Sequence, residues 1–227
     1  MRSAPLTVRS VIDAVEASLR EQILDQGIPV GAAVRETEVA RAFDVARPTA
    51  KAAIERLVAS GLLTRDVHKS ARVPTLSAAD VSDLYFSRTV LEEGIVRRLA
   101  SRRTLPTAAA DTITAMKALG TGALPTQYVA PDIEFHTALA AHVGSNRVTR
   151  MHAALMQEMQ LCMAQVQAHH LLSPTVIVAE HERIAEAILE RGPEAAAQEL
   201  RAHLEGARIA LVDFLGEPRG AGAGEAR

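Results

Sequence analysis

The most constraining stretch of this sequence is Asp-Ile-Glu-Phe-His at residues 132–136. On a helix, Asp132 and His136 lie one turn apart on the same face. At 100° per residue that face also carries the aliphatic residues Val129, Ile133, Leu139, Ala140 and Val143. A buried carboxylate needs a cation, a hydrogen-bond donor or a metal. Taken alone, the pair favours a buried Asp–His hydrogen bond over a metal site.

The composition favours helices. Only 3% of the 227 residues are aromatic, none is Trp, and Ala and Leu are abundant. The single Cys162 excludes an intrachain disulfide and indicates a reducing compartment. We see no signal peptide and no apolar run near the ~20 residues that span a bilayer. We therefore expect a cytoplasmic protein without a membrane partner.

Residues 1–75 read as a winged helix-turn-helix DNA-binding domain. The pattern predicts helices over 8–26, 36–43 and 47–60, with a tight turn at 44–46. Two short strands, 62–64 and 71–74, flank a polar tip at 66–70. In a winged helix-turn-helix the third helix enters the major groove and the hairpin wing touches the DNA backbone or minor groove.

The charge of this segment points to double-stranded DNA as partner. Between Arg41 and Arg72 there are seven basic and three acidic residues, although the whole chain has a net charge of −2. Arg47 and Lys51 lie one turn apart at the start of the third helix, and the wing tip carries His68 and Lys69. The alternative is a solvated basic face on a small helical domain.

Residues 76–216 read as an all-α antiparallel helical bundle, so the fold class is mainly α. Six helices are expected, over 77–103, 105–120, about 129–144, 146–170, from 173 to before a turn at 191–193, and 193–215. Ser77 is the expected N-cap of the first, with Asp80 at its third helical position. Residues 217–227 are rich in Gly and Ala and read as a disordered tail.

Further polar residues on the apolar, inward faces of other helices make a metal site the preferred interpretation of Asp132 and His136. His181 and His203 join Asp132 and His136, which places four candidate ligands, one Asp and three His, on three helices of one bundle. Such a set suits Zn, Ni, Mn, Co or Fe, with zinc first. The remaining histidines, His152 included, lie off the buried faces or at stripe edges. Arg88 also points inward and needs an anion, either Glu92 one turn on or a ligand carboxylate.

Two sets of residues resemble known families. Segments 34–40, 43–47 and 61–63 resemble the DNA-binding half of GntR-type transcription regulators. Segments 84–92, 132–136 with Asn146, 180–184 and 203–204 look like the FCD-type effector domain of the FadR branch, in its six-helix, VanR-like variant.

The resemblance implies specific roles. It implies a divalent transition metal on Asp132, His136, His181 and His203, and effector binding by Arg88 and Asn146. It implies a homodimer on a palindromic operator, with DNA-binding residues Arg35, Arg47, Thr49, Lys51, His68 and Lys69.

The expected function is a DNA-binding transcription regulator, a repressor rather than an activator, that responds to a small organic acid bound at the metal. We do not expect an enzyme, because there is no H-E-x-x-H and no inward general base beside the ligands. Two alternatives remain open. One is a metal-dependent enzyme acting on a small carboxylate, and the other is a regulator whose metal is purely structural.

Overall fold

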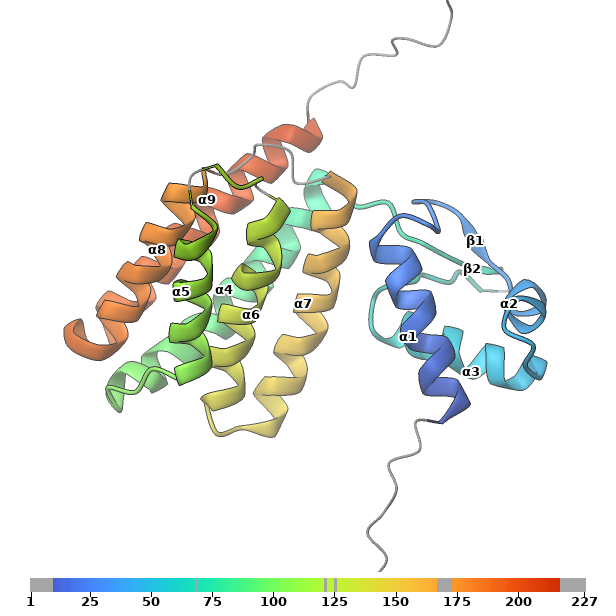
Figure 1. The fold of residues 1–227 in the computed structure, drawn as a ribbon, viewed down its shortest axis with the longest axis horizontal. Helices are drawn as coiled ribbons and strands as arrows, with labels where there is room; N and C mark the ends of the chain where they lie inside the picture. Colours follow the sequence, from blue (N-terminus) through green and yellow to red (C-terminus); the bar gives the residue numbers. More distant parts are fainter. Residues whose placement is uncertain (1–9, 68, 121, 125, 167–172, 217–227) are drawn as a thin grey trace, which may run out of the picture. The chain divides into compact units, whose positions relative to one another are not determined.

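The computed structural model describes residues 10–67, 69–120, 122–124, 126–166 and 173–216. The chain forms two compact units. One holds residues 1–75 together with 157–165, and the other holds 76–156 and 166–227. Helices dominate both units, which confirms the mainly α fold class (Figure 1). None of the helices described is both long and apolar enough to cross a membrane.

The first unit contains the helices α1 (Val11–Leu24), α2 (Glu36–Ala42) and α3 (Arg47–Ala59). Val8, the predicted start of the first helix, lies outside the described residues. The helix begins at Val11 because Ser10 caps it, its hydroxyl accepting from the Asp13 amide while the Asp13 carboxylate accepts from the Ser10 amide. Asp44 adopts a φ of 50° in the tight turn between α2 and α3.

The small sheet differs from the expected hairpin. Its two strands are β1 (Ala33–Val34) and β2 (Ala71–Arg72), paired antiparallel with Ala33 opposite Arg72. The predicted strand at 62–64 contributes one bridge, in which Thr64 and Arg72 exchange two hydrogen bonds of 2.8 Å. The sequence missed β1 because two residues are too few to show the alternation of a strand.

The core of this unit lies between α1 and α3. Val15, Leu19 and Ile23 on α1 are buried against the α3 stripe of Ala50, Ala53, Ile54 and Leu57. Val11, expected on the same face of α1, is instead 60% exposed at the start of the helix.

The second unit is a bundle of α-helices. They are α4 (Ala78–Ser101), α5 (Thr107–Leu119), α6 (Thr126–His142), α7 (Asn146–Val166), α8 (Pro174–Glu186) and α9 (Pro193–Gly216). Figure 1 shows α8, α5 and α6 side by side, with α4 and α9 forming a second layer behind them. The apolar stripes meet between these layers, so polar residues on the same stripes are forced together inside the unit.

Three details of the bundle bear on the site. Ser77 is the N-cap of α4, as predicted, and forms a capping box with Asp80, so the start of the helix is fixed about three turns before Arg88 and about four turns before Glu92. Pro131 lies inside α6, immediately before Asp132. The predicted helix that starts at 173 is α-helical up to Glu186. A π-helical turn, η1 (Ala187–Arg191), follows it directly. The predicted end of α7 at His170 and the predicted tail at 217–227 lie outside the described residues.

Candidate metal centre

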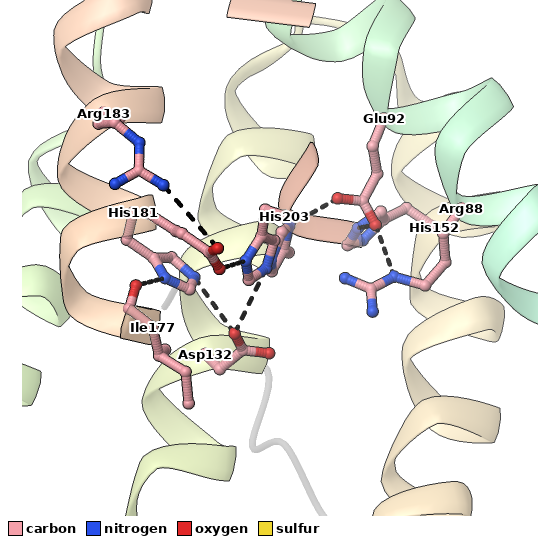
Figure 2. A network of polar contacts seen from close by, with 10 residues as sticks. Arg88, Glu92, Asp132, His152, Ile177, His181, Arg183 and His203 are labelled. Atoms are coloured by element: carbon pink, nitrogen blue, oxygen red, sulfur yellow. Dashed lines mark hydrogen bonds and ion pairs between the residues drawn. The ribbon is translucent and has the colours of Figure 1, made fainter. Parts of the chain in front are cut away.

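The four predicted metal ligands come together inside the helical unit. Asp132 and His136 come from α6, His181 from α8 and His203 from α9. One ligand atom from each lies within 4.8 Å of the others, and all three imidazoles are buried. Figure 2 shows the ring of His181 and the ring of His203 both directed toward Asp132. The helical periodicity of the sequence therefore selected residues that share one centre.

The same ring atom of each histidine faces this centre. Oδ1 of Asp132 lies 3.2 Å from Nε2 of His181 and 3.7 Å from Nε2 of His203. Nε2 of His136 lies 3.2 Å from Nε2 of His203. Three imidazole nitrogens and one carboxylate oxygen thus surround a single point, which is the donor set expected for a divalent transition metal.

The other ring nitrogen of each histidine contacts an oxygen that only accepts hydrogen bonds. Nδ1 of His136 donates to Oε2 of Glu92 at 2.6 Å, and Nδ1 of His203 donates to Oε2 of Glu180 at 2.9 Å. Nδ1 of His181 donates to the main-chain oxygen of Ile177 at 2.7 Å (Figure 2). In a neutral imidazole the proton is then on Nδ1, and the lone pair of Nε2 faces the centre. This outer layer of acceptors is typical of metal-binding histidines.

Burial and charge set the protonation of the centre. Burial lowers the pKa of His136 to about 4, outweighing the attraction of Glu92, so this imidazole is neutral at pH 7. Burial alone would raise the pKa of Glu92, but the charge of Arg88 and the hydrogen bond from His136 hold it well below its usual range. Burial alone would raise the pKa of Asp132, but its contacts with the three surrounding histidines, that with His181 above all, lower it. Both carboxylates are therefore ionised.

Arg88 lies beside this centre and is only 2% exposed. Its Nε donates to Oε1 of Glu92 at 2.9 Å, so the structural ion pair considered from the sequence is present. Nη2 of the same guanidinium is buried and has no hydrogen-bond partner among the described residues. Figure 2 shows the guanidinium extending from α4 toward the side where Asp132 lies. One arginine can therefore hold Glu92 and still offer a donor to a ligand.

Two other residues lie differently from their sequence interpretation. Asn146, assigned to effector binding, is exposed at the first position of α7, and the structure does not bring it to the buried centre. His152, placed at a stripe edge, is only 1% exposed and approaches Oε1 of Glu92 at 3.4 Å. The sequence signal that could have found it is its position about one turn before Leu155 and two turns before Met159, on the same face of α7.

The outer acceptor Glu180 was also missed. It directly precedes His181, so its side chain lies off the inward stripe of α8, yet it bonds a histidine of α9. Arg183 approaches its other oxygen at 3.8 Å and joins Glu199 on α9 through a 3.2 Å hydrogen bond. Glu180, Arg183 and Glu199 thus link α8 and α9 through charged contacts next to His203.

In the first unit, basic side chains gather between the start of α2, the start of α3 and the wing. Three of the predicted DNA-binding residues, Arg35, Arg47 and Lys69, line one pocket of about 360 Å³ together with Arg65. Lys51 is exposed one turn further along α3, and Thr49 is half-buried. His68 lies outside the described residues. Arg65 was not singled out from the sequence, because it precedes the wing tip and lies outside the third helix.

Two models of known protein families match this chain, one in each half of the sequence. Residues 83–206 match the model of the FCD domain, which covers more than half of the chain. Residues 11–73 match the model described as bacterial regulatory proteins, gntR family. This chain is a GntR-type transcription regulator with an FCD domain. The family resemblance found in the sequence is thereby confirmed.

Similar proteins are named as transcription regulators. The GntR regulator is 24% identical over 193 residues to YdhC, a helix-turn-helix transcriptional regulator of Bacillus subtilis (strain 168), with 82% of this chain and 84% of that protein covered. It is 27% identical over 204 residues to a protein of Paenarthrobacter nicotinovorans named "Probable D-xylose utilization operon transcriptional repressor", with 89% of each covered. A GntR regulator from Rhodococcus sp. RHA1 matches in structure with a TM-score of 0.75 at 27% identity, over 92% of this chain and 100% of that one.

Proposed function

We propose that this GntR regulator is a repressor whose DNA binding is controlled by a small organic acid, held jointly by a divalent metal and Arg88. The observation that carries the proposal is the approach of two Nε2 atoms, those of His136 and His203, to 3.2 Å. Both rings use Nδ1 as a donor, so two lone pairs face one another in a buried site. A cation placed between them removes this repulsion.

The donor set supports a transition metal as that cation. Asp132, His136, His181 and His203 would hold it, with zinc as our first choice and Ni, Mn, Co or Fe as the others. Nε2 of His181 is buried without a hydrogen-bond partner among the described residues, as expected of an atom reserved for a metal. When bound, the metal supplies the positive charge that draws a carboxylate into the centre.

Arg88 supports the acid as effector. Glu92 holds the guanidinium through Nε, which leaves Nη2 as a fixed donor in a buried site. A carboxylate oxygen would satisfy it. An effector that contacts helices α4, α6, α8 and α9 through these residues would favour one arrangement of the bundle over another, and it can shift DNA binding only by that difference in affinity.

The DNA-binding half of the proposal rests on the basic pocket between α2, α3 and the wing. We propose that a homodimer presents two such surfaces to the two halves of a palindromic operator in the cytoplasm. The repressor named among its relatives favours repression over activation.

The experiment combines metal analysis with ligand-dependent melting. Protein purified without chelator, or reloaded with zinc, should contain about one metal per chain, and a panel of hydroxy-, keto- and dicarboxylic acids should include one that raises its Tm. Arg88→Lys keeps a positive charge beside Glu92 but loses the free Nη2, so it should retain metal and lose at least about tenfold in acid affinity. Arg97→Lys, on the exposed side of the same helix, is the control.

Three outcomes contradict the proposal. A protein that takes up no metal contradicts the metal centre. A chelated protein that responds equally well to the acid makes the metal purely structural. Turnover of the acid by the loaded protein indicates an enzyme instead.

A further inference from the structure

One buried histidine of the helical unit, His152, contacts neither the proposed metal nor Arg88 through a hydrogen bond. Five buried side-chain nitrogens and oxygens have no hydrogen-bond partner among the described residues. Three of them gather around this centre, namely Nε2 of His181, Nη2 of Arg88 and Nε2 of His152. The first faces the proposed metal, and the second faces the proposed carboxylate. The third has no role in either.

His152 is held beside Glu92 without being satisfied by it. Its Nε2 lies 3.4 Å from Oε1 of Glu92, which is too long for a well-formed hydrogen bond, although the contact helps to lower the pKa of Glu92. The same Oε1 already accepts from Nε of Arg88 at 2.9 Å, and Oε2 accepts from His136 at 2.6 Å. Glu92 therefore has two shorter and better-oriented partners, and His152 is left as a third neighbour.

Arg88 and His152 are next to each other because they share this oxygen. Nε of Arg88 and Nε2 of His152 both lie within 3.4 Å of Oε1 of Glu92, on helices α4 and α7. Figure 2 shows His152 close behind the side chain of Glu92, on the same side of the centre as Arg88. Leaving Nη2 of Arg88 and Nε2 of His152 buried without partners is unfavourable, so an acceptor or donor from outside the chain is expected at this place.

We propose that His152 binds a neutral oxygen, a hydroxyl or keto group, of the effector whose carboxylate is held by the metal and Arg88. The inference rests on the proposed function and adds a residue that sets the specificity of the same site. A hydroxyl suits His152 in either tautomer, because it both donates and accepts hydrogen bonds.

The test compares acids of equal length that differ only in hydroxyl groups. Zinc-loaded wild-type protein is titrated with propanoate and with 2,3-dihydroxypropanoate, and then with butanoate and 2,3,4-trihydroxybutanoate. Wild type should prefer the hydroxylated member of at least one pair by about tenfold or more, because the plain acid leaves polar atoms unpaired. His152→Leu should keep its fold, its zinc and its affinity for the plain acid, and should lose most of that preference.

Two further variants separate binding from packing. His152→Gln places an amide near the position of Nε2 and should recover part of the preference. His142→Leu, at an exposed histidine near the end of α6, should change nothing. A full preference in His152→Leu, or no preference in wild type, overturns the assignment of His152 alone. If no acid binds the zinc-loaded wild type, the proposed function fails and this inference fails with it.

Discussion

The carboxylate oxygen Oε2 of Glu92 lies 2.6 Å from Nδ1 of His136, although the two residues are 44 positions apart in the chain. Through its other oxygen the same carboxylate holds Arg88. One buried side chain on α4 therefore orients both a proposed metal ligand and a proposed effector ligand. Without Glu92, His136 and Arg88 would each lose the hydrogen bond that fixes the orientation of the side chain.

Glu92→Gln should weaken metal binding by about 10- to 100-fold, which is typical for loss of an outer-layer carboxylate. The amide retains the size of the side chain but can accept from only one of the two donors, so its NH2 group opposes the other. The zinc affinity is measured by competition with a chelator. Glu93→Gln, at the next position, affects only the pairs with Arg97 and Arg201 and should bind zinc normally. Equal zinc affinity in both folded variants would count against the orienting role of Glu92.

The metal-free protein should lose stability as the pH falls from about 6.5 to 4. His136 has a pKa of about 4 when folded, against about 6.5 when unfolded, so in this window the unfolded chain binds more protons. The contribution is fully present above pH 6.5, and its loss by pH 4 is on the order of 3 kcal/mol. Urea unfolding of chelated protein at pH 7.5 and pH 4 measures it. His142→Gln, at an exposed histidine of the same helix, should show the same pH dependence as wild type.

Lys51→Ala should reduce the preference for operator DNA. Lys51 is exposed on α3, next to the basic pocket that Arg35, Arg47 and Lys69 line. If α3 enters the major groove, the loss should be larger for the operator than for a scrambled duplex. Gel shifts over a range of salt concentrations give both affinities, and wild-type binding should weaken steeply with salt. Arg20→Ala on α1, where Arg20 pairs with Glu16, is the control and should retain operator preference.

Ser77→Ala should destabilise the protein by about 1 kcal/mol. The hydroxyl of Ser77 accepts from the Asp80 amide at the start of α4, and the Asp80 carboxylate accepts from the Ser77 amide in return. Denaturant unfolding measures the change in free energy. Ser82→Ala removes a hydroxyl that only bonds back to the Ala78 carbonyl within the same helix, so it should change stability by less than about 0.5 kcal/mol.

The sequence revealed the part of the centre that depends on local helix geometry. Asp132, His136, His181 and His203 each lie on an apolar stripe, and a stripe faces the core wherever the helices are packed. The outer acceptors follow from packing between helices instead. Glu92 reaches His136 only because α4 lies against α6, and Glu180 reaches His203 only because α8 lies against α9.

The same distinction explains the remaining errors. His152 is buried although it appeared to lie at the edge of the α7 stripe, since its burial depends on the neighbouring helices. Asn146 was assigned from the resemblance alone, and its exposure at the first turn of α7 gives that assignment no support. In the first unit, the expected hairpin became one bridge plus a strand pair, because the partner of β2 is 37 residues before it and too short to leave a periodic signal.

Pro131 interrupts the main-chain hydrogen bonding of α6 directly beside the proposed metal ligand Asp132. Proline has no amide hydrogen, so the main-chain oxygen of Gln127 receives no helical hydrogen bond from position 131. The turn formed by residues 126–130 is therefore held to the rest of α6 by one main-chain hydrogen bond fewer than an uninterrupted helix would have. Its amides should exchange with solvent before those of the rest of α6. If this turn frays, Asp132 is the proposed ligand that solvent reaches first, because it is half-buried and directly follows Pro131, while the three histidines are fully buried.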